Sequence, residues 1–379
     1  MLDSPRATLG KDAVAETHQY TYATNKMDFN KDLNLKGKYC YHPFNTVTID
    51  QRGDCFVCVC QAWLPISVGN IMDFNSLDEI VHSPRAREIQ ASIADGSFRY
   101  CDHKTCHLIV RDELETRINH KSDTVNWIVF AVDDSCNLQC PSCRTDLIFH
   151  KDGKDFEFRL KMMKHIAKLI NQHRHFIRFT LSGDGDPFAS HIYRKLLKTL
   201  KLTASHQVEI EIVTNGILVK KHWKEMMGVH GKVYRFKISF DAGTEEVYKI
   251  TRRGGQWNKL LESTKYIIDW RNSHDPKMQI SLNFVVQDSN YQDIVKFAQL
   301  GKELGVDEIG FQKVTDWGKF NVGGVNMFKQ HAIWMPDHPK HQELLEMLNH
   351  EELFDPRIEL TNLSHLAKKH PDRPSSNTK

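Results

Sequence analysis

The sequence predicts an α/β fold in which a parallel sheet, open or partly closed as a barrel, follows a small cysteine-rich domain. From Val125 onward, strand-like segments alternate with helix-like segments, an order that is typical of parallel sheets. Residues 39–108 instead hold six of the nine cysteines and short strand-like pieces with little apolar core. Such a small domain usually needs a metal to hold it together.

The alternation after Val125 predicts six strands. They lie at 127–132, 177–181, 208–212, 236–240, 280–284 and 309–311. Helix-like stretches separate them, near 160–170, 193–202, 220–227, 257–270 and 291–304. A further helix is expected at 341–349.

We expect four regions along the chain. They are a disordered leader over 1–36, the cysteine-rich domain over 37–120, the barrel over 121–315 and a C-terminal extension with a disordered tail over 316–379.

The composition is typical of a soluble globular protein, with 40% hydrophobic and 26% charged residues. No apolar run is long enough to span a bilayer, and residues 1–30 lack the apolar centre of a signal peptide. The formal net charge of +3 gives no reason to expect nucleic acid as a partner. We therefore expect a cytoplasmic protein without a membrane or nucleic-acid partner, in which nine cysteines favour metal binding or catalysis over disulfides.

Three cysteines, Cys136, Cys140 and Cys143, follow the first predicted barrel strand with C-x3-C-x2-C spacing. Three thiolates on one loop can ligate three irons of a four-iron cluster, which leaves the fourth iron open to another ligand. A structural zinc site is the alternative, but it needs four ligands and most often shows two C-x2-C pairs. The spacing therefore favours a cluster with an open iron.

In this spacing and position, over roughly residues 125–313, the sequence resembles the radical S-adenosylmethionine (SAM) superfamily. The resemblance implies a partial (β/α)6 barrel and a [4Fe–4S] cluster whose open iron chelates SAM. In that family one electron from the reduced cluster cleaves SAM to methionine and a 5′-deoxyadenosyl radical, which abstracts hydrogen from the substrate. It also implies an external one-electron reductant of the flavodoxin or ferredoxin type.

The resemblance further implies SAM-binding residues at the ends of the second, third and fourth strands. These candidates are Ser182, Gly183, Asp184, Gly185, Asp186, Asn215, Ser239 and Asp241. The first five, with Pro187, resemble the family's Gly-Gly-Glu-Pro-like motif, although Asp186 stands where Glu is commoner. The alternatives are a glycine-rich turn, an Asn-Gly turn and a helix N-cap.

The remaining cysteines predict a second cluster. The four that we expect as ligands are Cys40, Cys58, Cys101 and Cys106. Spacing alone leaves zinc and an iron–sulfur cluster open. However, C-x12-G-x4-C from Cys40 to Cys58 resembles the SPASM or twitch domain, which usually follows the barrel and here precedes it. The resemblance implies one auxiliary [4Fe–4S] cluster, with Cys55 and Cys60 as spare thiols.

We therefore expect a radical SAM enzyme that acts on a peptide, a protein side chain or a small polar metabolite. The second cluster would assist electron transfer or substrate binding. The alternative is a non-catalytic iron–sulfur protein that transfers electrons or binds a partner, but such a protein needs neither an open iron nor a SAM-binding turn. No residue of the sequence singles itself out as a catalytic acid or base.

Overall fold

The computed structural model describes residues 33–116, 123–181, 185–200, 202, 206–316, 320–322 and 325–368 of the 379-residue chain. The predicted leader up to residue 32 and the predicted tail from residue 369 lie outside these ranges. Among the helices of the described residues, none combines the length and apolar character needed to cross a membrane.

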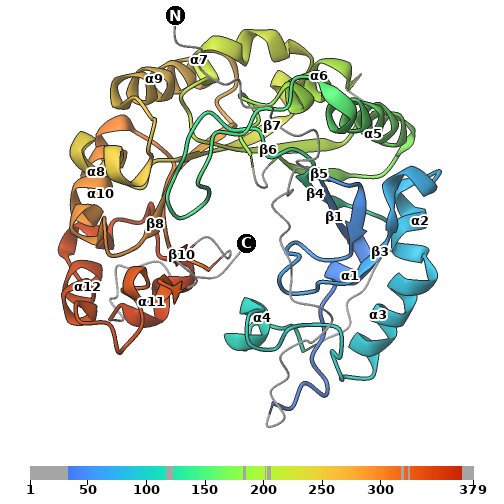
Figure 1. Cartoon of the computed structure of the whole chain (residues 1–379), viewed down its shortest axis with the longest axis horizontal. Helices are drawn as coiled ribbons and strands as arrows, with labels where there is room; N and C mark the ends of the chain where they lie inside the picture. Colours follow the sequence, from blue (N-terminus) through green and yellow to red (C-terminus); the bar gives the residue numbers. More distant parts are fainter. Residues whose placement is uncertain are drawn as a thin grey trace, which may run out of the picture.

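A ten-stranded sheet forms the core of the fold, and its order is β12-β9-β8-β7-β6-β5-β4-β1-β2-β3. The six predicted strands are its parallel centre: β4 (Trp127–Ala131), β5 (Ile177–Leu181), β6 (Val208–Thr214), β7 (Val233–Ser239), β8 (Gln279–Val286) and β9 (Glu308–Lys313). The sheet curves into a ring (Figure 1). Since β4 and β9 do not pair with each other, the ring stays open and does not close into a barrel. The predicted partial (β/α)6 barrel is confirmed.

The helices that connect these strands lie outside the ring (Figure 1). They are α5 (Gly153–Gln172), α6 (His191–Thr199), α7 (Val219–His222), α8 (Glu245–Thr251), α9 (Trp257–His274) and α10 (Ile294–Leu304), with 3₁₀ turns η2 (Trp223–Lys232) and η3 (Tyr291–Asp293). The helix predicted near 220–227 is α7 continued by η2, with a break in helical geometry at Met226.

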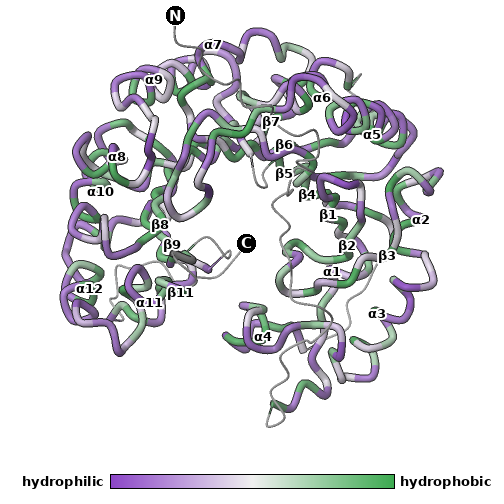
Figure 2. The backbone as a smooth tube through the Cα atoms, viewed as in Figure 1, coloured by the Kyte–Doolittle hydropathy of each residue, from purple (hydrophilic) through white to green (hydrophobic). Residues whose placement is uncertain are grey.

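The two faces of the barrel sheet differ in polarity. On the outer face, Phe236 contacts Trp223 of η2 and Phe284 contacts Phe297 of α10, and all four side chains are fully buried. In Figure 2, the helices that surround the ring carry purple, hydrophilic stretches. Since neighbouring residues of a strand point to opposite faces, the residues on either side of these phenylalanines face the inside of the ring.

Charged and polar residues occupy that inner face. Arg178 of β5 pairs with Glu209 of β6 at 2.7 Å. Lys237 of β7 pairs with Glu211 of β6 at 2.9 Å. The inside of the ring is therefore polar.

The cysteine-rich N-terminal region extends the same sheet. It contains α1 (His42–Asn45), β1 (Thr46–Asp50), β2 (Asp54–Phe56), β3 (Ser67–Asn70), η1 (Ile71–Asp73), α2 (Leu77–His82), α3 (Pro84–Ala94) and α4 (His107–Val110). Strand β1 pairs in parallel with β4 and antiparallel with β2. The region is thus attached through the first barrel strand, and the predicted domain boundaries stay a prediction.

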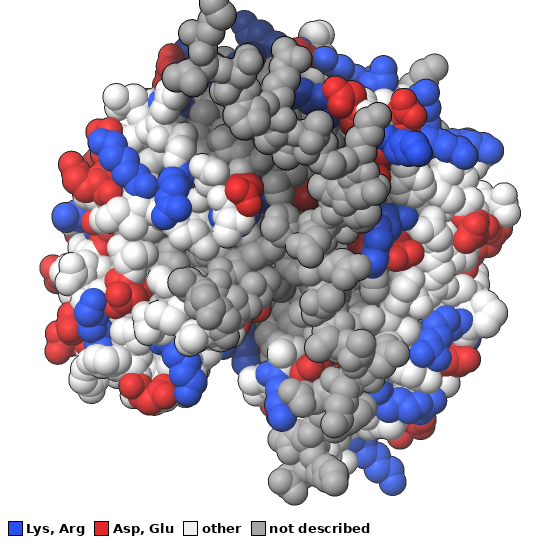
Figure 3. All heavy atoms as spheres, viewed as in Figure 1, with Lys and Arg blue, Asp and Glu red and all other residues white. Residues whose placement is uncertain are grey.

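The C-terminal region covers the opposite edge of the sheet. It contains β10 (Asn321–Val322), β11 (Val325–Asn326), α11 (Phe328–His331), α12 (His341–Leu348), η4 (Glu351–Phe354), β12 (Ile358–Glu359) and η5 (Thr361–Leu366). Strand β12 pairs in parallel with β9. Figure 1 places α4 and α11 on the two sides of the gap in the ring, and the surface in Figure 3 is hollowed at the corresponding edge.

Candidate functional site

The three-cysteine loop lies at the carboxyl end of β4. The loop is held by two backbone hydrogen bonds, from Cys136 N–H to Ile148 O at 2.8 Å and from Gln139 N–H to Arg253 O at 2.9 Å. Cys136 and Cys140 are buried, and Cys143 is half-buried. Burial raises the pKa of the Cys136 thiol to about 12, so a bound metal would have to displace a proton from it.

Each of the three thiols meets one polar side chain at 3.7 Å. The pairs are Asn215 Nδ2 with Cys136 Sγ, Arg252 Nη1 with Cys140 Sγ and Arg144 Nη2 with Cys143 Sγ. Burial lowers the pKa of the Arg144 guanidinium, but the three thiols raise it by more, so its net pKa is increased. Asn215 is one of the SAM-binding residues predicted from the sequence, whereas Arg144 and Arg252 are not among them.

Two acidic residues before Cys136 tie its loop to helix α5. Arg159 of α5 donates from Nη1 to Asp133 at 2.5 Å and to Asp134 at 2.8 Å. Ser190 donates to Asp133, and His150 Nε2 lies 2.7 Å from Asp134. The two carboxylates and His150 approach closely enough to hold a metal ion, but Arg159 already supplies the positive charge there.

The loop after β5 packs directly on the cysteine loop. A Cβ atom at Gly185 would lie 2.4 Å from the carbonyl oxygen of Asp133, so only glycine allows this approach. The next residue, Asp186, donates its backbone N–H to Ser135 O at 2.9 Å. Ser182, Gly183 and Asp184, also predicted to bind SAM, lie outside the described residues.

The carboxylate of Asp186 is fully buried and accepts four hydrogen bonds. Phe188 N and Ala189 N reach Oδ1 at 3.0 and 3.1 Å. Thr214 Oγ1 and Asn215 N reach Oδ2 at 2.7 and 2.8 Å. Burial raises its pKa although these four bonds lower it. The carboxylate thus joins the ends of β5 and β6, and its predicted contact with the ammonium group of SAM stays a prediction.

Asp241, another predicted SAM contact, is also engaged within the protein. It has a positive φ of 55°, and its Oδ1 accepts the N–H of Val285 at 2.7 Å. Its Oδ2 lies 2.7 Å from Nη2 of Arg252, whose other nitrogen reaches Cys140. Ser239 ends β7 and is half-buried. The carboxyl ends of β4, β6 and β7 therefore meet around the thiols, as expected for parallel strands, while the roles predicted for these residues stay predictions.

In the N-terminal region, five cysteines gather rather than four. Besides the predicted four, Cys60 interacts electrostatically with Cys58 and Cys106, and Cys58 with Cys40 and Cys101. Burial raises the pKa of Cys60 to about 11, although hydrogen bonding from the backbone of Ala62 and Trp63 lowers it. Hydrogen bonds of this kind stabilise a thiolate.

The sixth cysteine of this region, Cys55, lies apart. Its thiol donates to the carbonyl oxygen of Gly53 at 3.7 Å. The charged groups that act on it, after the dominant effect of burial, are Asp50, Asp54 and Asp73. Cys55 therefore behaves as a buried thiol of β2, whereas Cys60 belongs with the candidate ligands.

The spacing of the sulfur atoms tests which metal group these cysteines suit. Four thiolates on one zinc ion at about 2.3 Å lie about 3.8 Å from one another. Within the described residues, which include all nine cysteines, no three cysteine sulfurs lie within 4.8 Å of one another. In the described residues neither set is therefore as compact as the sulfurs of a single zinc site.

Two buried hydrogen-bond donors near the three-cysteine loop have no acceptor in the part of the chain that the structure describes. Within the described residues, neither Nε of Arg252 nor the hydroxyl of Tyr248 has a hydrogen-bond partner. Tyr248 is fully buried, and Asp241, Cys140 and Asp186 all act on its pKa, which burial raises. Buried donors without partners are rare, so they indicate room for a polar ligand next to the cysteines.

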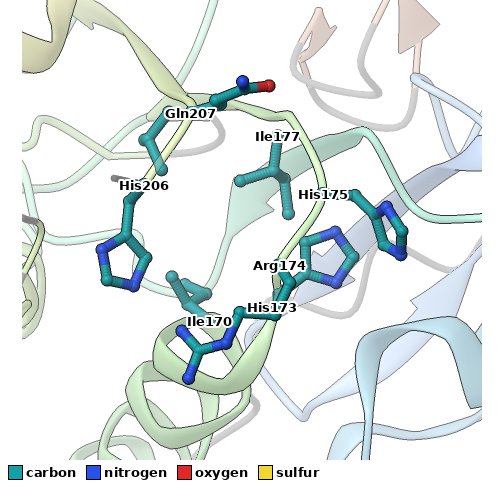
Figure 4. Close-up of a pocket in the computed structure, with 8 residues that line it drawn as sticks. Ile170, His173, Arg174, His175, Ile177, His206 and Gln207 are labelled. Atoms are coloured by element: carbon teal, nitrogen blue, oxygen red, sulfur yellow. The ribbon is translucent and has the colours of Figure 1, made fainter. Parts of the chain in front are cut away.

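A separate cavity of about 360 Å³ opens at the other end of the barrel strands. Its polar lining comes from His173, Arg174, His175, His206 and Gln207, which precede β5 and β6 (Figure 4). Since the cysteine loop follows the carboxyl end of β4, this cavity is not part of the cysteine site.

An open α/β barrel with three thiols after its first strand, and a second thiol group in an adjoining region, defines an iron–sulfur protein. Comparison with protein families agrees. The model described as the radical SAM superfamily matches residues 133–307, and that of the SPASM iron–sulfur cluster-binding domain matches residues 40–107. The chain belongs to the radical SAM superfamily and carries its SPASM domain ahead of the barrel. It is therefore an enzyme whose cofactors are a SAM-binding [4Fe–4S] cluster, an auxiliary [4Fe–4S] cluster and SAM, as predicted.

Curated relatives are distant. GTP 3′,8-cyclase of Staphylococcus epidermidis is 25% identical over 238 residues, which cover 59% of this chain and 67% of that protein. GTP 3′,8-cyclase of Alkaliphilus metalliredigens is 26% identical, over 48% of this chain and 55% of that protein. The chain thus spans about half to two thirds of the length of these relatives.

Solved structures of similar fold are also distant. Streptococcus suis SuiB bound to S-adenosylmethionine matches 65% of this chain and 47% of its own, with a TM-score of 0.39 and 15% identity. The protein anSMEcpe with bound AdoMet and Kp18Cys peptide matches 61% of this chain and 59% of its own, with a TM-score of 0.40 and 16% identity.

Proposed function

We propose that this enzyme cleaves SAM at a [4Fe–4S] cluster held by Cys136, Cys140 and Cys143 and removes a hydrogen atom from a small polar substrate inside the ring. When bound, the cluster and SAM supply the 5′-deoxyadenosyl radical for that step. One observation carries the proposal: three thiols, two of them buried and one half-buried, are each contacted by a polar side chain and lie beside two unpartnered buried donors at the carboxyl end of the sheet.

The chain's own residues would each contribute to this chemistry. Asp186 and Gly185 hold the loop after β5 against the cysteine loop, which fixes the three thiols relative to the barrel. Tyr248 and Arg252 would donate hydrogen bonds to the carboxylate or another polar part of SAM. A second cluster, held by four of the five gathered N-terminal cysteines, would pass electrons or bind substrate.

For the substrate, we favour a phosphate-bearing metabolite such as a purine nucleotide over a peptide. The curated relatives are named for a reaction of GTP. In this chain Lys313, at the carboxyl end of β9, has its pKa lowered by burial and by Arg111 of the N-terminal region. Burial, Lys313 and Arg111 likewise lower the pKa of His365 in η5.

Two cationic side chains, Lys313 and Arg111, thus come together with His365 from the two ends of the open sheet. The lowered pKa of His365 favours its neutral form, and Arg111 also pairs with Glu113 at 2.6 Å. Among the described residues, no carboxylate forms an ion pair with Lys313, which instead lies 4.3 Å from the ring of Trp334. Cations that repel one another are stabilised by an anion between them. A phosphate group bound there would span the gap between the N-terminal region and β9.

SAM cleavage is tested with anaerobically reconstituted, chemically reduced protein. We expect 5′-deoxyadenosine and methionine to form slowly even without substrate, and about eight irons per chain, as two four-iron clusters require. The variant with Cys136, Cys140 and Cys143 all changed to Ala should keep about half the iron and form no 5′-deoxyadenosine. Equal product formation by the two proteins would refute the assignment.

Substrate class is tested by equilibrium binding to the reconstituted protein. GTP should bind at least tenfold more tightly than guanosine, and Lys313→Met should abolish that preference. Lys329→Met, which changes an exposed lysine paired with Asp337, is the matched control and should leave the preference intact. Equal binding of GTP and guanosine to the unaltered protein would overturn the phosphate proposal without touching SAM cleavage.

A further inference from the structure

The two arginines at the three-cysteine site differ in how their charge is balanced. Arg252 contacts Cys140, but its guanidinium also forms a 2.7 Å ion pair with the buried Asp241. Arg144 contacts Cys143 and donates its other nitrogen to the neutral backbone oxygen of Asp134 at 2.7 Å. Among the described residues, no carboxylate pairs with Arg144.

This difference matters for a cluster because reduction adds one negative charge. A fixed positive charge beside the cluster sulfurs stabilises the reduced state and raises the reduction potential, and so do hydrogen bonds to those sulfurs. Arg144 is only 8% exposed, so water screens its charge poorly. The positive charge of Arg252 is largely cancelled by the carboxylate of Asp241, which lies 2.7 Å from its guanidinium.

We propose that Arg144 is a positioning residue that raises the reduction potential of the SAM-binding cluster, while Asp241 neutralises the equivalent charge of Arg252. The inference rests on the proposed assignment of Cys136, Cys140 and Cys143 as cluster ligands. Neither side chain needs to touch the substrate: Arg144 acts through Cys143, and Asp241 acts through Arg252. Their removal should therefore shift the potential in opposite directions.

The test is a dithionite titration of the reconstituted full chain at set potentials, followed by electron paramagnetic resonance. Arg144→Met should lower the ratio of reduced to oxidised cluster at least tenfold at the midpoint of the unaltered protein, which corresponds to about 59 mV. Arg144→Lys, which keeps a charge near the sulfur, should recover most of this loss. Asp241→Asn should shift the ratio upward, and Asn tolerates the positive φ of this residue.

Controls separate the possible failures. Arg178→Met removes a guanidinium at the amino end of β5, where it pairs with Glu209, and should leave the potential unchanged. Iron content and the oxidised spectrum show whether each variant still holds its cluster. The auxiliary cluster also contributes a signal, so the signal that is followed is the one that changes when SAM is added. If that signal survives replacement of all three cysteines, the ligand assignment fails. If the signal is lost in that variant but Arg144→Met titrates like the unaltered protein, the inference about Arg144 is wrong.

Discussion

Asp186→Ala is the change that best separates a structural role from a cofactor-binding role of the loop after β5. The carboxylate accepts four hydrogen bonds within the protein and is 1% exposed. Removing a buried acceptor leaves its donors unsatisfied, at about 1 kcal/mol for each donor as the lower bound. Four donors give a loss of about 4 kcal/mol in the free energy of unfolding.

Two further substitutions at the same position refine this estimate. Asp186→Asn keeps one oxygen for the two backbone donors on Oδ1, and the Thr214 hydroxyl can turn to accept from the new amide. Only the N–H of Asn215 is then left unsatisfied, at a cost of about 1 kcal/mol on the same scale. Asp186→Glu adds a methylene to a side chain that is already buried, which costs about 2 kcal/mol through overpacking. The expected order of stability is Asp, then Asn and Glu, then Ala.

The assay is the thermal midpoint of the metal-free protein, followed by tryptophan fluorescence, together with SAM affinity of the reconstituted protein. For a barrel of this size each kcal/mol corresponds to roughly 2–4 °C, so Asp186→Ala should lower the midpoint by roughly 8–16 °C. Asp152→Ala, at an exposed position that makes no capping hydrogen bond, is the control and should not shift it. An unchanged midpoint with tenfold weaker SAM binding would refute the structural role and support the direct cofactor contact predicted from the sequence.

Four other substitutions test the N-terminal cysteines, the buried Asp133 ion pair and the buried His230. Cys60→Ala should lower iron content or alter the auxiliary-cluster spectrum, whereas Cys55→Ala should change neither; identical spectra for both variants would contradict the inclusion of Cys60. Arg159→Met leaves the fully buried Asp133 without its cation and should cost about 3–5 kcal/mol, measured by denaturant unfolding. Burial between tryptophans lowers the pKa of His230 in the folded state, so the unfolded chain gains a proton first as pH falls. The thermal midpoint should therefore drop as pH falls below about 6.5, and His230→Gln should weaken that dependence.

Much of the fold could be predicted from the sequence because strands and helices each have a characteristic spacing of apolar residues. The six barrel strands appear as short segments with regularly spaced apolar residues, and each of the first five is followed by a helix with buried apolar residues. The three-cysteine loop could also be recognised from the sequence, since Cys136, Cys140 and Cys143 lie within eight residues of one another and directly follow a predicted strand. Spacing also identified the cysteine-rich region, to which the SPASM family model corresponds.

The sequence could not show how that region joins the barrel. The parallel pairing of β1 with β4 brings together residues about eighty positions apart, and it follows from sheet register rather than from any local pattern. The same limit applies to Cys60. Its place among the other four thiols depends on the turn after β2 that separates it from Cys55.

The sequence by itself determined the chemistry of the protein: three thiolates on one loop, a second thiol group and a barrel to carry them. Only the tertiary structure decided what surrounds those thiols. Arg252 reaches Cys140 across 112 positions of the chain, and Asp186 meets Asn215 across 29. Such contacts arise because parallel strands bring their carboxyl ends to one edge, where loops distant in sequence must satisfy one another's buried charges and hydrogen bonds.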